Sequence, residues 1–362
     1  EKRMLDKFQF ESKKWLHNYL SSNSSKNNLA LYGGLCDLAS SFRRANEKFS
    51  FYEEEMKILN QEIYILLEKR IELLNSQIDD IAEHEFDTIS GLAGIVNYCF
   101  QNDSFFHDLN EKILKIFILK SNSETGWKIQ NRYLDEAYRK TFPCGYINLS
   151  ISHGVLGPLI SMSHALEIGY KIDGLEDSVK KIMKLYEMYF DMKSGKIPCI
   201  VDVSNEKKNV FYNRDSWSYG SAVIFFGLMK ASKLVRDDKS YCIYRKALLD
   251  RLVLGNDFDK WGFVSPTLLN GYSGILCLLK KLNEEEKMGL LSDEIIKIEE
   301  HLINMYDSTI KYGFKHYEYK YVKDNVWSVA TYDLEGLAYG ALGVILSLQG
   351  DKELLKSRLL LY

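Results

Sequence analysis

Segments that begin with glycine and continue as an apolar run recur along the chain, about 50 to 70 residues apart. The six leading glycines are Gly34, Gly91, Gly154, Gly220, Gly271 and Gly340. In four of the six segments a second glycine follows three positions later. Each apolar run is long enough for a buried helix, and the spacing fits a pair of helices with their loops. Loose helix packing could also produce such glycine pairs, but the repeat favours a ring of helix pairs.

The stretches between these segments have the pattern of surface helices. The clearest is 53–74, where apolar residues at three- and four-residue spacing lie opposite charged ones. Its apolar positions are Met56, Leu59, Ile63, Ile65, Leu66 and Ile71. Strand signals are sparse, and the best candidate, 196–203, could form a short hairpin arm. We therefore predict an all-α fold: one α,α-toroid domain over residues 1–362, a double-layered helical barrel of six to seven helix pairs.

Composition narrows the function classes. The 362 residues carry a formal net charge of −3, which gives no electrostatic reason to bind nucleic acid or an anionic membrane. The longest apolar runs, such as 155–162, are too short for a transmembrane segment. The six cysteines lie far apart and no secretory signal opens the sequence, so we expect reduced thiols in a cytoplasmic protein.

Three of the helix starts carry recognisable motifs: FDTISGLAGI (86–95), NLSISHGVLGPL (148–159) and NRDSWSYGSA (213–222). In this order they resemble the lanthionine synthetase C family, cyclases that add cysteine thiols to dehydrated residues of lanthipeptide precursors. The resemblance spans essentially the whole chain and implies an α,α-toroid with zinc at its centre. It also implies catalytic roles for Asp87 and His153 in proton transfer, and for Arg214 in orienting groups at the same site.

The departures from the family pattern fall at the positions of the zinc ligands. The resemblance places the zinc ligands, two cysteines and a histidine, at Ser218, Leu269 and Asn270. A catalytic zinc needs about three Cys, His or carboxylate ligands, and a leucine cannot coordinate at all. We therefore expect no zinc and no other cofactor. Relocated ligands such as Cys277 have no spacing in their favour and are interpreted as core residues.

Two functions of different classes follow. One is a zinc-independent cyclase that binds a dehydrated precursor peptide in a central cavity. The alternative is a non-catalytic pseudo-cyclase that binds the peptide or scaffolds a dehydratase or other modifying enzyme. Either would use substrate-binding residues at the cavity, for which we predict Trp217, Tyr219, Asn270 and Tyr272. A carbohydrate-active toroid is a weaker third possibility, because it needs a carboxylate pair and only Asp87, with the more distant Glu335, is available.

Overall fold

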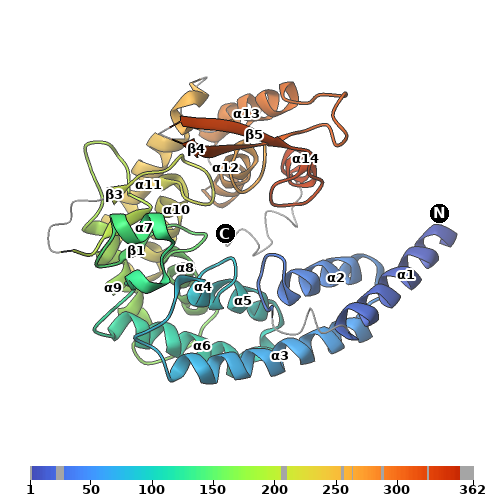
Figure 1. Ribbon diagram of the computed structural model, residues 1–362, viewed down its shortest axis with the longest axis horizontal. Helices are drawn as coiled ribbons and strands as arrows, with labels where there is room; N and C mark the ends of the chain where they lie inside the picture. The colour runs from blue at the N-terminus through green and yellow to red at the C-terminus, as the bar shows by residue number, and fades with distance from the viewer. Residues whose placement is uncertain are drawn as a thin grey trace.

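The computed structural model describes residues 2–21, 28–204, 210–253, 257–262, 264–286, 289–323 and 326–350. Its helices form two layers around a common centre (Figure 1). The inner helices are α2 (Leu35–Phe49), α5 (Leu92–Cys99), α8 (Leu156–Glu167), α10 (Ser221–Leu234), α12 (Tyr272–Glu286) and α14 (Ala341–Gln349). The outer helices are α3 (Glu53–Asn75), α6 (Asp103–Asn122), α9 (Leu175–Glu187), α11 (Asp238–Leu252) and α13 (Ser292–Asn304).

Each of these outer helices packs against the inner helix that precedes it, so the predicted α,α-toroid is confirmed. The described residues contain five complete pairs and the inner helix of a sixth, against the six to seven pairs expected. Neighbouring inner helices also pack on one another, α5 on α8 and α8 on α10. The repeat in the sequence is therefore the repeat of the fold.

The two layers differ in burial as their sequences predict. Every residue of the inner helix α5 is buried. In the outer helix α3, the expected core positions Met56, Leu59, Ile63 and Ile71 are buried. Ile65 was expected there too, but its side chain is exposed, because the buried stripe continues through Leu67 and Leu74 instead.

The leading glycines are required by close approach of the backbone. At Gly91 a Cβ atom would lie 2.2 Å from the amide nitrogen of Asp87, and at Gly271 it would lie 1.8 Å from the carbonyl oxygen of Ser265. Both distances are far below a real Cβ contact. The chain therefore turns so tightly before each inner helix that no side chain fits at its start.

A line of backbone hydrogen bonds runs around the centre and joins the loops before the inner helices. We call it the girdle. Its six members each lie two positions before a leading glycine, and the amide of each of the first five donates to the carbonyl of the next member. The bonds are Tyr32 to Ile89 (3.3 Å), Ile89 to Ser152 (3.3 Å), Ser152 to Ser218 (3.3 Å), Ser218 to Leu269 (3.1 Å) and Leu269 to Ala338 (3.1 Å).

Two small antiparallel sheets accompany the helices. The first contains β1 (Tyr146–Asn148), β2 (Ile200–Asp202) and β3 (Val210–Phe211), and β2 lies within the predicted strand candidate. The second is a hairpin of β4 (His316–Lys323) and β5 (Val326–Tyr332), which the sequence analysis did not predict. Aromatic and charged residues alternate along β4, and this two-residue period is the strand signal that was missed.

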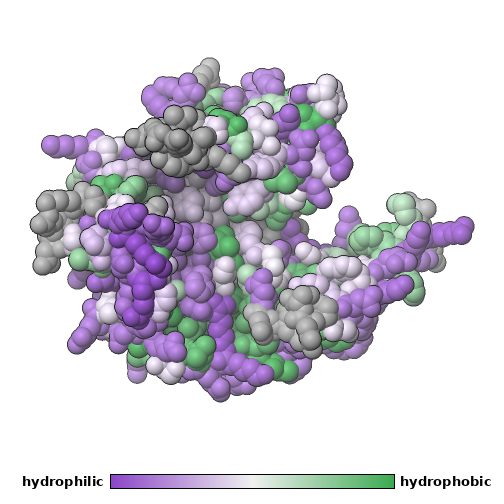
Figure 2. Space-filling view, in the orientation of Figure 1, coloured by the Kyte–Doolittle hydropathy of each residue, from purple (hydrophilic) through white to green (hydrophobic). Residues whose placement is uncertain are grey.

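The remaining helices are α1 (Lys2–Ser21), α4 (Glu83–Phe86) and α7 (Glu136–Thr141). Short 3₁₀ turns span 100–102, 131–133, 258–261 and 289–291. Helix α1 projects from the ring, and Figure 2 shows hydrophobic and hydrophilic surface side by side on it. No helix in the described part of the chain is long and apolar enough to span a membrane.

Candidate functional site

The motif residues Asp87 and His153 meet at the centre of the ring. They come from consecutive repeats, because Asp87 ends the short helix α4 and His153 follows β1. Nδ1 of His153 lies 2.6 Å from Oδ2 of Asp87, which is a short, charge-assisted hydrogen bond. The sequence motifs therefore place an imidazole and a carboxylate in direct contact.

Asp87 is held in place by backbone donors. Its Oδ1 accepts hydrogen bonds from the amides of Ser90 and Gly91, each at 2.7 Å. Because Gly91 is the N-cap of α5, the buried carboxylate also lies at the positive end of that helix dipole. With Oδ1 bound to the backbone, Oδ2 is the oxygen available to His153.

His153 is half-buried, and its environment favours the protonated ring. Burial acts to lower its pKa, but the hydrogen bond to Asp87 and the charges of Asp87 and Glu83 outweigh burial and raise it. Since Nδ1 faces Asp87, Nε2 is the nitrogen left for a substrate. A histidine in this setting can deliver a proton at Nε2 and take one back.

A second carboxylate, Glu83, faces the same histidine and was missed by the sequence analysis. Its Oε2 accepts a hydrogen bond from the hydroxyl of Tyr146 at 2.9 Å and one from the amide of Asn148 at 3.3 Å. Glu83 lies four residues before Asp87, and this short spacing of two acids next to a family motif is the signal that could have identified it.

Arg214 lies in another sector of the centre, where it influences His316 and Tyr339 electrostatically. Its Nε and Nη1 are buried and have no hydrogen-bond partner among the described residues. His316, to which the sequence analysis gave no role, is buried on β4 with Nδ1 at 3.1 Å from both Ser265 Oγ and Thr267 Oγ1. Burial lowers the pKa of His316, so it favours the neutral ring beside the guanidinium.

Tyrosines connect the two sectors. The ring of Tyr219 lies 6.4 Å from that of His153, and Tyr339 interacts electrostatically with both Tyr219 and Tyr32. Burial raises the pKa of all three phenols, which keeps them neutral hydrogen-bonding groups. The centre therefore combines a charged His–Asp pair, an arginine and neutral phenols.

The three expected ligand positions do not form a metal site. Ser218 is buried, and its Oγ donates a hydrogen bond to the carbonyl of Leu269 at 3.0 Å. The Leu269 side chain is apolar and buried, and Asn270 has a buried Oδ1 without a hydrogen-bond partner among the described residues. Across the described ranges there is no group of three His, Cys, Asp or Glu residues that could hold a metal ion. This donor set does not fit zinc, which prefers thiolate, imidazole or carboxylate ligands.

Comparison with known proteins agrees with the fold and the motifs. A family model described as lanthionine synthetase C-like protein matches residues 9–348. The chain belongs to the lanthionine synthetase C-like family. The nisin biosynthesis protein NisC of Lactococcus lactis subsp. lactis is 24% identical over 306 residues, covering 79% of this chain and 70% of NisC. The solved structure of a nisin cyclase superposes with a TM-score of 0.80 at 19% identity, covering 99% of this chain and 86% of that one.

Among the substrate-binding residues predicted for this lanthionine synthetase C-like chain, only some face the centre. Tyr219 lies beside His153. Trp217 is fully buried with its ring 6.3 Å from that of Tyr32, so it supports the inner wall. Tyr272 was predicted to bind substrate, but its ring packs 4.4 Å from that of His301 on the outer helix α13, between the helix layers. This packing shows where the Tyr272 ring lies, and its role in substrate binding stays a prediction.

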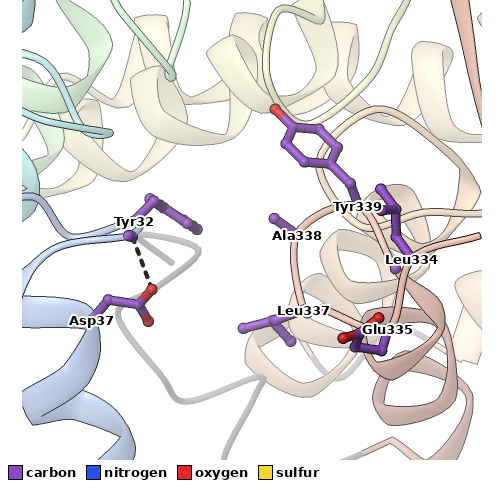
Figure 3. A pocket seen from close by; sticks show the side chains of 10 residues that line it. Tyr32, Asp37, Leu334, Glu335, Leu337, Ala338 and Tyr339 are labelled. Atoms are coloured by element: carbon purple, nitrogen blue, oxygen red, sulfur yellow. Dashed lines mark hydrogen bonds between the residues drawn. The ribbon is translucent and has the colours of Figure 1, made fainter. Parts of the chain in front are cut away.

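A cavity of about 420 Å³ lies between the start of α2 and the loop before α14. Figure 3 shows Tyr32 and Asp37 on one side and Leu337, Ala338 and Tyr339 on the other. Burial raises the pKa of Asp37, although its carboxylate accepts a hydrogen bond from the Gly33 amide at 2.9 Å. Since Tyr32 and Ala338 are the two ends of the girdle, this cavity occupies its open sector.

Proposed function

We propose that this lanthionine synthetase C-like protein binds a dehydrated precursor peptide at the centre of the ring and closes thioether bonds without zinc. The observation that carries the proposal is the short Asp87–His153 hydrogen bond, which leaves one imidazole nitrogen for the substrate. A structural remnant would need no half-exposed imidazole. The reaction is the addition of a cysteine thiol to the carbon–carbon double bond of a dehydroamino acid.

The protonation steps follow from the charges at the centre. The cysteine loses its proton to solvent, and the thiolate attacks the β-carbon of the dehydroamino acid, which leaves an enolate. Nε2–H of the protonated His153 then delivers a proton to the α-carbon, and the ring recovers a proton from solvent. The product has the same mass as the reactant, because one S–H and one C=C become one S–C and one C–H.

Arg214 suits an anionic group of the bound peptide. Its Nε and Nη1 are buried and lack hydrogen-bond partners within the described residues, and an anionic oxygen would satisfy them. Because Arg214 lies in another sector of the centre than His153, in this proposal it holds the peptide, and the proton transfer belongs to His153. The neutral phenol of Tyr219, beside His153, helps to enclose the peptide.

Without a zinc-bound thiolate, the rate depends on the small fraction of free thiolate at neutral pH. A cysteine thiol has a pKa of about 8.5, so a few per cent is ionised. Holding thiol and alkene in contact geometry can compensate for several kcal/mol of barrier. The peptide must arrive already dehydrated, so a dehydratase acts before this protein, and both would work in the cytoplasm.

The test combines metal analysis with a cyclisation assay. Purified protein is analysed for zinc and then incubated with a synthetic peptide that carries one dehydroalanine and one cysteine. Iodoacetamide then reports the free thiol by mass spectrometry. We expect substoichiometric zinc and loss of the alkylatable thiol without a mass change, faster than in buffer alone.

Two variants locate the chemistry. His153→Ala should reduce the rate to that in buffer, whereas Cys242→Ser, which changes an exposed residue on the outer helix α11, should retain it. A wild-type protein that binds the peptide but leaves its thiol fully alkylatable would refute the cyclase and indicate the pseudo-cyclase instead.

A further inference from the structure

Glu83 and Asp87 present two carboxylates to one histidine. Glu83 is the first residue of α4 and Asp87 is the C-cap of the same short helix. Residues four apart in a helical turn lie on the same face, so both acids point to the same side. Asp87 contacts His153 directly, whereas Glu83 acts on it through charge.

The position of Glu83 is fixed by a strand that also leads to the histidine. Tyr146 and Asn148 are the first and last residues of β1, and alternate residues of a strand project from the same face. Both donate to Oε2 of Glu83, at 2.9 and 3.3 Å. Since β1 is paired with β2 and continues into the loop that carries His153, Glu83 is tied to the same segment as the imidazole.

The groups around the His153 imidazole differ in whether they carry a charge. Those that act on His153 in the described structure are Asp87, Glu83 and, by ring contact, Tyr219. Burial raises the pKa of Tyr219 and of Tyr146, so both phenols are neutral. Burial, together with the charge of Asp87, raises the pKa of Glu83 above its ordinary value, although the hydrogen bonds from Tyr146 and Asn148 and the charge of His153 oppose that rise. The acidic groups that face the imidazole are therefore the carboxyl groups of Asp87 and Glu83.

We infer that Glu83 is a positioning residue for His153: held by Tyr146 and Asn148, it adds a second negative charge that keeps the imidazole protonated. The inference rests on the proposed function only for the use made of the proton, which is delivered to the α-carbon of the enolate. Glu83 itself touches neither the peptide nor the reacting atoms. Its effect is on how much of the protein carries the acid form at neutral pH.

The experiment measures the protonation of His153 in the full chain without any peptide. The Cε1–H resonances of the seven histidines are titrated by NMR, and His153 is assigned from the spectrum of His153→Gln. In Glu83→Gln, whose side chain can still accept from Tyr146, we expect the pKa of His153 to fall by about 0.5–1 unit. Glu83→Asp, which retains the charge, should restore most of the difference.

A matched control separates local charge from overall charge. Glu136→Gln removes an equally charged but solvent-exposed side chain and should leave the His153 titration unchanged. An unchanged titration in Glu83→Gln, or an equal fall in Glu136→Gln, would overturn the inference. If circular dichroism shows that Glu83→Gln does not fold, the comparison of Glu83→Asp with wild type still tests the inference. A fall of about 0.5–1 unit in the pKa of His153 in Glu83→Asp, which retains the charge, would contradict it.

The same variants distinguish this inference from the proposed function. Where the cyclase assay works, Glu83→Gln should shift the alkaline limb of the pH–rate profile to lower pH by the amount seen in the titration. Where wild type shows no cyclisation, the titration still reports the role of Glu83, so failure of the reaction and failure of the inference give different results.

Discussion

Replacing Asp87 separates its structural from its electrostatic role. Asp87→Ala leaves the amides of the half-buried Ser90 and the buried Gly91 without the acceptor that each now has at 2.7 Å. An unsatisfied buried donor costs about 1–3 kcal/mol, so the two together predict a loss of about 2–6 kcal/mol in the free energy of unfolding. Asp87→Asn keeps an amide oxygen for both donors and should lose no more than about 1–2 kcal/mol.

The assay is unfolding in guanidinium chloride monitored by circular dichroism. The free energies of unfolding of the two variants are compared where their m-values agree. Both variants should be inactive in cyclisation, because neither holds His153 as a cation. Equal destabilisation by the two substitutions, or a loss below 1 kcal/mol in Asp87→Ala, would refute the assignment of Oδ1 to the backbone.

The pH dependence of stability provides a second test of the Asp87–His153 pair. The pKa of His153 is raised above its ordinary value of 6.5 in the folded protein. Its contribution to stability is therefore fully present below pH 6.5 and is lost as the pH rises through the folded pKa. Since Asp87→Asn removes the partner charge, the stability advantage of wild type over this variant should be larger at pH 6 than at alkaline pH. An advantage that grows with pH would contradict the pairing.

Two further sets of substitutions test the ring and the ligand positions. Gly271→Ala should destabilise by about 3 kcal/mol or more, because its Cβ would meet the Ser265 carbonyl at 1.8 Å, whereas Gly336→Ala, where nothing lies within 4 Å, should cost less than about 1 kcal/mol in the same unfolding assay. The combined variant Ser218→Cys, Leu269→Cys and Asn270→His should bind zinc in about one-to-one ratio by metal analysis, and wild type should not; equal zinc in both would refute the ligand argument.

The fold could be predicted from the sequence because its strongest constraint is local. Glycine is needed wherever the chain turns tightly into an inner helix, and Gly91 and Gly271 show the contacts that exclude a side chain. The β4–β5 hairpin was missed because it interrupts the helical repeat. The described residues end within the sixth helix pair, so the expected count of six to seven pairs stays a prediction.

The site could be predicted only where motif residues carry it. Asp87 and His153 lie in quoted motifs and meet in space. Glu83 could not be recognised in the same way, because its partner Tyr146 is 63 positions away and only the fold joins them. Tyr272 follows Asn270 closely in sequence, yet the first turn of α12 directs its ring toward the outer layer, which only the fold shows.

The girdle explains how a ring can exchange its central chemistry without being rebuilt. Its bonds use amides and carbonyls, so the loops keep their positions whatever side chains they carry, with proline excluded for lack of a donor. Ser218 and Leu269 are both members, so backbone hydrogen bonds hold two of the three positions where the family pattern has metal ligands. The backbone of the ring therefore holds these loops in place, and the side chains at the centre can differ in their chemistry.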